Sequence, residues 1–297
     1  MNAQAREFIE AEKTAGGNVA KACRLLEVSR SAFYDSLDRP ACERVRLDRE
    51  LTETISAYHR ASRGTYGAPR ILVDLRDAGE HVSRKRVARL MAAAGLVGVC
   101  SRRRRQTTIA GAEARAVNII KRVFGPSNWE LDQAWCGDIT YVRTWAGWAY
   151  LATVIDMASR RVVGWAMADH METSLVEDAL RVAIAARRPA AGLIFHADRG
   201  SQYTSKDFRR LLTANHMTQS LSRRGQCWDN AVAESWFATY KNELVYRGVW
   251  PTMAKLRTAT FDYIEVFYNR QRRHTALDGL SPAHYEYTQQ HPATQAA

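Results

Sequence analysis

The sequence predicts an α/β protein in which helical segments precede a layered domain with a mixed sheet. Two observations carry this prediction. From about residue 129 onward, short runs rich in aromatic and β-branched residues alternate with amphipathic stretches, a pattern typical of strands followed by helices. Before that point the apolar residues recur at helical spacing. The length of 297 residues suits two domains and allows a small third.

Each element of the layered domain is indicated by its own pattern. Three consecutive antiparallel strands, a buried strand and a short last strand are expected over residues 136–144, 147–156, 161–167, 192–197 and 217–222. Helices are expected over residues 173–187, 205–215, 230–245 and 253–274. The tail after Ser281 lacks periodicity, so we expect it to be poorly ordered.

Two helix-turn-helix-like segments occupy the N-terminal part, over residues 18–37 and 66–95. Ser29 in the first and Ser83 in the second are positioned to cap the second helix of each. The helix after Ser83 carries four cations on its outer side, Arg84, Lys85, Arg86 and Arg89. A basic helix capped in this way can enter a DNA major groove. A solvated face on a small helical bundle is the alternative interpretation.

Positive charge is concentrated in the same part of the chain. Residues 1–125 contain 24 Lys and Arg against 14 Asp and Glu, whereas residues 126–297 contain 19 against 17. A one-sided basic excess suits neutralisation of phosphates, and solubility alone does not require it. Four consecutive arginines are expected to form a flexible linker or an arm that follows phosphates: Arg102, Arg103, Arg104 and Arg105.

The five cysteines argue against two classes of protein. They are odd in number, contain no Cys-x-x-Cys, and have no paired histidines at ligand spacing, so neither a zinc site nor a secreted disulfide framework is expected. The first residues are polar and mixed in charge, and the longest uncharged run is too short to span a bilayer. We therefore expect a cytoplasmic protein with reduced thiols and no membrane partner.

Three carboxylates, Asp138, Asp198 and Glu234, stand in contexts that favour a shared site. Asp138 interrupts a run of strand formers although aspartate is depleted in strands, and a buried lone carboxylate is costly unless it is paired or bound to metal. Asp198 ends the next buried strand, where ligand sites of α/β sheets commonly lie. Each acid alone is more easily explained as a cap or a surface charge. Together they predict ligands for hard divalent cations.

Glu234 shares a helix face with two other polar residues. Asn230 lies four residues before it, about 40° round the helix, and Lys241 lies seven residues after it, about 20° the other way. The stripe combines a metal ligand, an amide and an ammonium group. Lys241 could hold a DNA phosphate as a point charge, and we expect Asn230 to contact DNA beside it.

This ligand set predicts phosphodiester chemistry assisted by Mg²⁺ or Mn²⁺, with two ions in each active site. Two such ions about 3.5–4 Å apart clamp a scissile phosphate and stabilise the attacking and leaving oxygens. No Ser-His-Asp or Cys-His pairing offers a covalent nucleophile, so the attacking group is water or a DNA 3′-hydroxyl. Asp156 also follows a strand and is the alternative to one of the three acids, although its neighbours indicate a turn that it caps.

These motifs resemble those of a known family. The contexts of the three acids, over residues 135–140, 196–203 and 229–235, are similar to those of the DDE transposases of insertion-sequence family three, relatives of the retroviral integrases. The likeness extends to residues 65–71 and 268–274, so it covers roughly residues 60–285.

The resemblance implies an RNase H-like catalytic core in which Asp138, Asp198 and Glu234 bind the metal ions and Lys241 contacts the element end. It implies a bacterial, nucleoid-associated transposase that binds terminal repeats, cuts and joins DNA, and acts as a homo-oligomer on DNA. An upstream reading-frame product is a further expected partner, since this chain lacks zipper-like heptads. The expected domains are two helix-turn-helix-like segments, a basic linker, the catalytic core, and a C-terminal helix and tail: residues 1–60, 61–100, 101–128, 129–250 and 251–297.

Two other functions remain open. A DNA-binding regulator with a structural acidic core accounts for the helix-turn-helix segments but gives no reason for the carboxylate contexts, and it should behave alike with and without Mg²⁺. A nuclease that cuts without joining uses the same ligands. Joined products separate the nuclease from the transposase.

Overall fold

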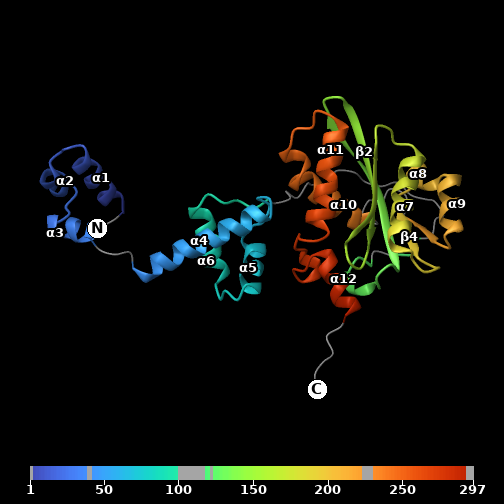
Figure 1. The fold of residues 1–297 in the computed structure, drawn as a ribbon, viewed down its shortest axis with the longest axis horizontal. Coiled ribbons are helices and arrows are strands. Elements are labelled where there is room, and N and C mark those ends of the chain that lie inside the picture. The colour runs from blue at the N-terminus through green and yellow to red at the C-terminus, as the bar shows by residue number, and fades with distance from the viewer. Residues whose placement is uncertain (1–2, 39–41, 100–117, 121–122, 223–229, 292–297) are drawn as a thin grey trace, which may run out of the picture. The chain divides into compact units, whose positions relative to one another are not determined.

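The fold of the 297-residue chain is taken from a computed structural model. It describes residues 3–38, 42–99, 118–120, 123–222 and 230–291, and the chain divides into two compact units, Met1–Thr54 and Ile55–Ala297 (Figure 1).

Helices alone make up the described part of the first unit. Asn18 and Ser29 cap two of them, because their side chains accept hydrogen bonds from the backbone N–H groups of Lys21 and Ala32. The apolar core joins Ile9, Cys23 and Phe33. The helices are α1 (Ala3–Thr14), α2 (Val19–Leu25), α3 (Arg30–Asp38) and the first part of α4 (Glu43–Ala61), which continues into the second unit.

The second predicted helix pair is confirmed as α5 (Ala68–Asp77) and α6 (Arg84–Ala93). Ser83 caps α6 by accepting from the N–H of Arg86. The apolar stripes expected to face inward are buried: Ile71, Leu72 and Leu75 on α5, and Val87, Leu90 and Met91 on α6.

Five strands form one mixed sheet in the order β3-β2-β1-β4-β5. The first three pair antiparallel, and β4 and β5 extend the sheet in parallel from β1. The strands are β1 (Ala134–Thr144), β2 (Gly147–Asp156), β3 (Val162–Ala168), β4 (Ile194–Ala197) and β5 (Thr218–Leu221). The predicted mixed sheet is therefore correct, and the predicted strand bounds agree to within two residues.

Helices cover both faces of the sheet (Figure 1). On one face, α7 (Thr173–Arg187) packs on β2 and β3, and α9 (Lys206–Ala214) packs on β5, with the short α8 (Ser201–Thr204) between them. The approach of α7 requires glycine at position 164, because a Cβ there would lie 2.3 Å from the carbonyl oxygen of Ala179. Trp135, Phe195 and Phe208 fill the core on this side.

On the other face, α10 (Ala231–Glu243) packs on β1 and α11 (Met253–Phe261) packs on β2. The single helix predicted over residues 253–274 is wrong, since α11 passes into a π-helical segment, η4 (Asp262–Tyr268), and the helix stops there. The stop has a physical reason. Asn269 directs its side chain at the edge strand β3, accepting from the N–H of Val162 at 3.0 Å and donating to its carbonyl oxygen at 3.0 Å.

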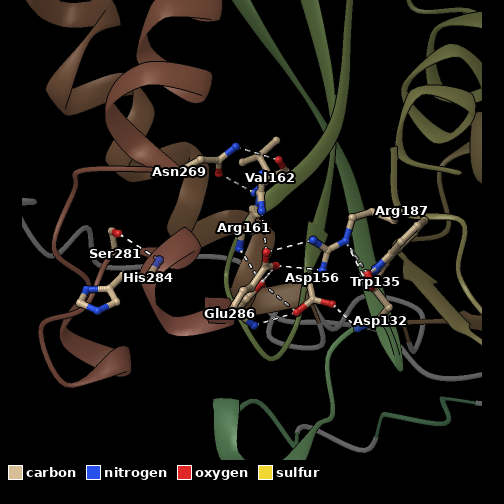
Figure 2. A network of polar contacts seen from close by, with 11 residues as sticks. Asp132, Trp135, Asp156, Arg161, Val162, Arg187, Asn269, Ser281, His284 and Glu286 are labelled. Carbon is tan, nitrogen blue, oxygen red and sulfur yellow. Dashed lines mark hydrogen bonds and ion pairs between the residues drawn. The ribbon is translucent and has the colours of Figure 1, made fainter. Parts of the chain in front are cut away.

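The expectation of a poorly ordered tail after Ser281 is wrong for residues 282–290, which form α12 (Pro282–Gln290). Its anchor is Glu286, only 4% exposed, which accepts hydrogen bonds from Arg161 and Arg187 (Figure 2). Arg187 reaches further to Asp132, so α12 is tied to β3, α7 and the start of β1. These partners lie 99 to 154 positions away, which hid them from local periodicity.

Candidate active site

Strand register brings Asp138 and Asp198 to neighbouring places in the sheet. Cys136 of β1 pairs with His196 of the parallel strand β4, and each acid follows its paired residue by two positions. Adjacent strands lie about 4.8 Å apart, and residues two apart on a strand share a face. The two carboxylates therefore start from neighbouring backbones just beyond the last β1–β4 pair, Asp138 inside β1 and Asp198 directly after β4.

Glu234 belongs to α10, and one buried amide fixes where that helix begins. Asn230, 5% exposed, donates from Nδ2 to the carbonyl oxygen of Gly137 at 3.2 Å. Gly137 directly precedes Asp138, so the bond joins the start of α10 to the backbone that carries the first acid. Glycine is required there because a Cβ would lie 2.6 Å from the Phe195 ring.

The electrostatics of Asp138 link the four residues of the predicted site. The pKa of Asp138 is raised to about 7. Burial is the main cause and the charges of Asp198 and Glu234 add to it, whereas the N–H of Ile139 and the ammonium of Lys241 lower the pKa. Asp198, Glu234 and Lys241 therefore all lie within electrostatic reach of Asp138. Burial alone raises the pKa of Glu234.

Asp198 stays accessible to ligands. It is exposed, and its Oδ1 accepts from the backbone N–H of Gly200 at 2.9 Å, a contact that orients the carboxylate at the end of β4. His196, two residues earlier, is 1% exposed, and its ring nitrogens contact Ser220 and Ser222. His196 therefore joins the end of β4 to β5 and to the residue that follows it.

The donor chemistry fits a hard divalent cation, because carboxylate oxygens of like charge gather around Asp138 and a cation would relieve the repulsion. Within the described ranges, however, no group of three or more His, Cys, Asp or Glu side chains is gathered so as to hold an ion as it stands. Asp138 and Asp198, on adjacent strands, are the two that could share one.

Asp156, the alternative acid, is held by a turn. Its carboxylate accepts from the backbone N–H of Asp132 (Figure 2). It also accepts from the backbone N–H groups of Ala158 and Ser159 and from the Ser159 hydroxyl. It is fully buried and pairs across the sheet with Trp135, three residues before Asp138. This is the turn-capping arrangement that its neighbours indicated.

The residues expected to contact DNA lie on α6, on α10 or at its start, and in the run of four arginines. Arg84, Lys85 and Arg89 are exposed on α6, and Arg86 is half-buried. Lys241 lies over the ring of Tyr141, with Nζ 5.4 Å from its centroid. Asn230 is buried against β1, a structural contact that the sequence did not indicate, and its expected DNA contact stays a prediction. Arg102, Arg103, Arg104 and Arg105 lie outside the described residues.

Comparison with known proteins bears on this site. The integrase core domain family matches residues 130–227 and, in a second form, residues 215–282, and an HTH-like domain family matches residues 46–105. The chain is 36% identical to transposase InsF of insertion sequence IS3A from Escherichia coli, over 94% of this chain and 97% of that one. The chain belongs to the insertion-sequence-three transposases. It is also 37% identical to the 31 kDa protein of insertion element IS600 from Shigella sonnei, over 88% of this chain and 96% of that protein.

Membership of this family bears out the predicted fold and enzyme class. The chain is a polynucleotidyl transferase of the retroviral integrase superfamily, with an RNase H-like mixed-sheet core after a helical HTH-like region. Among solved structures, the catalytic core of the HTLV-2 integrase aligns with 52% of this chain and 95% of its own length, at 17% identity and a TM-score of 0.41. In the described part of the chain, no helix is long and apolar enough to cross a membrane.

Proposed function

We propose that this transposase cuts and joins the DNA ends of its insertion sequence in a metal-dependent reaction at Asp138, Asp198 and Glu234. The observation that carries the proposal is the electrostatic coupling at Asp138, whose pKa responds to both other acids and to Lys241. A solitary structural aspartate has no reason to be buried inside a central strand within electrostatic reach of two further carboxyl groups.

The chain's own residues divide the work. Asp138 and Asp198 would hold the metal ions, and Glu234 would complete the ligand set from α10. Bound divalent ions supply stabilisation of the charge that develops on the attacking and leaving oxygens. Lys241, on the face of Glu234, orients a phosphate of the element end as a point charge. The Asn230 amide keeps α10, and with it Glu234 and Lys241, at a fixed distance from β1.

The wider expectations are part of the same proposal. The exposed cations of α6 would recognise the terminal repeats by entering a groove. Holding two element ends for joining requires more than one protomer, so the protein would act as an oligomer on DNA at the bacterial nucleoid. An upstream reading-frame product remains a proposed partner.

The test is Asp138→Asn in the full chain, which keeps the side-chain shape and removes the negative charge. We expect strand cleavage and strand joining to fall by at least about a thousandfold, roughly 4 kcal/mol of transition-state stabilisation, with binding of element-end DNA unchanged. Labelled ends incubated with Mg²⁺ and resolved on a denaturing gel measure nicked and joined strands. The matched control is Asp169→Asn, at an exposed position outside the site.

Three results would contradict the proposal. Joined products from Asp138→Asn would remove this residue from the site. Equal behaviour of the wild type with and without Mg²⁺ would favour a DNA-binding regulator, and cutting without any joined product would favour a nuclease.

A further inference from the structure

A cavity of about 400 Å³ lies beside α10. The helix contributes Ala231, Val232, Ser235, Trp236 and Thr239 to its wall. At 100° per residue, Trp236 points about 200° round the helix from Glu234. Neither Glu234 nor either of the two aspartates of the site is among the lining residues, so the cavity is distinct from the acidic site, although the same helix carries both.

Two buried donors that line the cavity have no hydrogen-bond partner among the described residues. They are Nη1 of Arg160, a residue 8% exposed, and Nε1 of Trp236, which is 3% exposed. Nδ1 of His274, on the same wall, is likewise unpartnered there. A buried polar group without a partner costs about 1–3 kcal/mol, and native interiors rarely leave one. Three unpartnered polar atoms in residues around one cavity indicate that their hydrogen-bond partners come from a ligand.

The charge of the wall selects an anion. Arg70, Arg160 and Arg272 all line the cavity. Glu243 accepts two hydrogen bonds from Arg272, at 2.7 Å each, and lies 3.6 Å from Arg70. Arg160 donates to the carbonyl oxygen of Phe124, its Nη1 has no partner among the described residues, and Asp156 is the carboxylate that acts on its charge. Three guanidinium groups line the cavity, and neither of these carboxylates is among the lining residues.

His274 adds a neutral donor or acceptor to this charge. Burial, followed by the charges of Arg272, Arg160 and Arg70, lowers its pKa to about 3, so the ring is uncharged at pH 7. Its Nε2 contacts the hydroxyl of Tyr268 at 3.3 Å, and its Nδ1 has no partner among the described residues. The wall therefore offers both cationic and neutral polar groups.

The size and the remaining lining indicate more than a bare phosphate. Cavities of roughly 300–1,000 Å³ take small organic ligands. Phe124, Trp236 and Tyr268 supply aromatic surface. Trp236 stacks on Tyr240 with the two ring planes 7° apart, and its Nε1–H has no acceptor among the described residues. Nucleobases carry ring-nitrogen and carbonyl acceptors for such a donor.

We propose that this cavity binds one nucleotide unit of a DNA strand, its phosphate on Arg160 and the neighbouring guanidinium groups and its base against Trp236 and His274. The proposal rests on the proposed function only in taking DNA as the substrate. It gives α10 two tasks: one face positions the acids, and the other holds a nucleotide of the strand.

The test uses equilibrium binding to the full chain, by calorimetry, with thymidine 5′-monophosphate as the probe. We expect it to bind at least about tenfold more tightly than thymidine or inorganic phosphate, because both halves of the site contribute. A short single-stranded oligothymidylate should displace it. Equal binding of inorganic phosphate, or failure of the oligonucleotide to compete, would overturn the assignment of a DNA nucleotide.

Exposed positions at the cavity mouth provide variants that leave the buried arginines intact. Ala276→Glu places a carboxylate at the mouth and should weaken nucleotide binding by at least about tenfold. Ala276→Gln, whose side chain has the same shape as glutamate without the charge, should bind the nucleotide within about threefold of the wild type. Ser235→Glu and Ser235→Gln form a second matched pair on α10. Similar binding by the Glu and Gln variants at both positions would overturn the proposal.

The catalytic variant separates this inference from the proposed function. Asp138→Asn should bind thymidine 5′-monophosphate like the wild type. If Asp138→Asn loses strand joining and the wild type does not bind the nucleotide, only the proposal of a nucleotide-binding cavity is refuted. If nucleotide binding responds to Ala276→Glu and Asp138→Asn still joins strands, only the proposed function is refuted.

Discussion

At the scale of single residues, Asp138 is poised between two protonation states near neutral pH. Burial is the main cause, and the like charges of Asp198 and Glu234 add to it, so its pKa rises to about 7. An unperturbed aspartate has a pKa of about 4 and is therefore fully ionised at neutral pH. Metal ligands must be deprotonated, so protons and metal ions compete for this carboxylate.

The sign of the pH dependence follows. As pH rises through about 7, Asp138 loses its proton and becomes a better ligand, so the apparent Mg²⁺ affinity should increase. We expect a gain of up to about tenfold per pH unit between pH 6 and 7 that flattens above pH 8. The shift of the thermal unfolding midpoint with Mg²⁺ concentration measures it without reference to activity. A flat profile in the wild type, or an unchanged profile in Asp138→Asn, would contradict the assignment.

At the scale of elements, α10 depends on its first contact with the sheet. The Asn230 amide is buried and bonds the backbone of Gly137, while its Oδ1 finds no partner among the described residues. The bond bridges 93 positions of sequence and connects the helix of Glu234 to the strand of Asp138. A small displacement here separates the acids, which makes Asn230 a positioning residue.

Asn230→Ala should lower the unfolding free energy by about 1–3 kcal/mol, because a buried carbonyl loses its donor. Strand joining should fall by at least about tenfold while DNA binding persists, and more Mg²⁺ should be needed for the same thermal shift. Asn242→Ala on the same helix is the control, since that amide bonds only within the helix and is exposed. Equal losses in the two variants would show that helix stability alone is affected.

The C-terminal helix α12 depends on the charge of Glu286. Burial opposes its ionisation, but hydrogen bonds and charge from Arg187, and then Arg161, outweigh burial and lower the pKa. The folded state therefore favours the ionised form. The resulting stability is present above the ordinary glutamate pKa and is lost as pH falls through the lowered value.

Glu286→Gln should destabilise the protein by about 1–3 kcal/mol at pH 7, because two partly buried guanidinium groups lose a charged partner, although Arg187 keeps its contact with Asp132. The difference from the wild type should shrink as pH falls below about 4. Urea unfolding at both pH values measures it. Asp207→Asn, which breaks a pair exposed at both ends, should cost less than about 1 kcal/mol. A constant difference across pH would mean that the packing of Glu286, and not its charge, matters.

At the scale of the whole molecule, local patterns predicted what local physics controls. Aromatic and β-branched content along 147–156 and the helical stripe along 173–187 gave the bounds of β2 and α7, because β2 is a central strand buried almost throughout and α7 buries one face. The break after Tyr268 and the order of α12 depend on partners such as Val162 and Arg187, which no window of sequence contains. A local signal for α12 did exist: Ser281 accepts from the N–H of His284, and proline follows at the first helical position.

The candidate site divides in the same way. Asp138 and Asp198 were found because a charged residue inside or ending a strand contradicts its surroundings. The stripe of Glu234 and Lys241 followed from helix geometry alone. Asn230 could be placed on that stripe, but its contact with Gly137 required the sheet register and the packing of α10 on β1.

Long-range ion pairs also connect the HTH-like region to the catalytic core within the second unit. Arg273 lies 2.6 Å from Asp74 and 2.6 Å from Asp77 of α5, and its backbone N–H donates to the hydroxyl of Tyr66. Asp74 is the buried partner, with 16% of its side chain exposed against 60% for Asp77. Burial, with a smaller contribution from the charge of Asp77, raises the pKa of Asp74 more than Arg273 lowers it. Arg273 therefore offsets part of the cost of ionising Asp74.

The cost of breaking this tie should therefore depend on which partner is removed. Arg273→Met strands a buried carboxylate and should cost about 3 kcal/mol at pH 7, whereas Asp74→Asn, which removes the charge that burial opposes, should cost less than about 1 kcal/mol. The double variant should be more stable than Arg273→Met alone. Because a raised pKa means the folded state binds the proton more tightly, Arg273→Met should regain stability as pH falls below about 5. Urea unfolding of the wild type, the two single variants and the double variant measures these differences. If Asp74→Asn lost as much unfolding free energy as Arg273→Met, attraction between the two side chains, and not the penalty of an unpaired charge, would join α5 to the core.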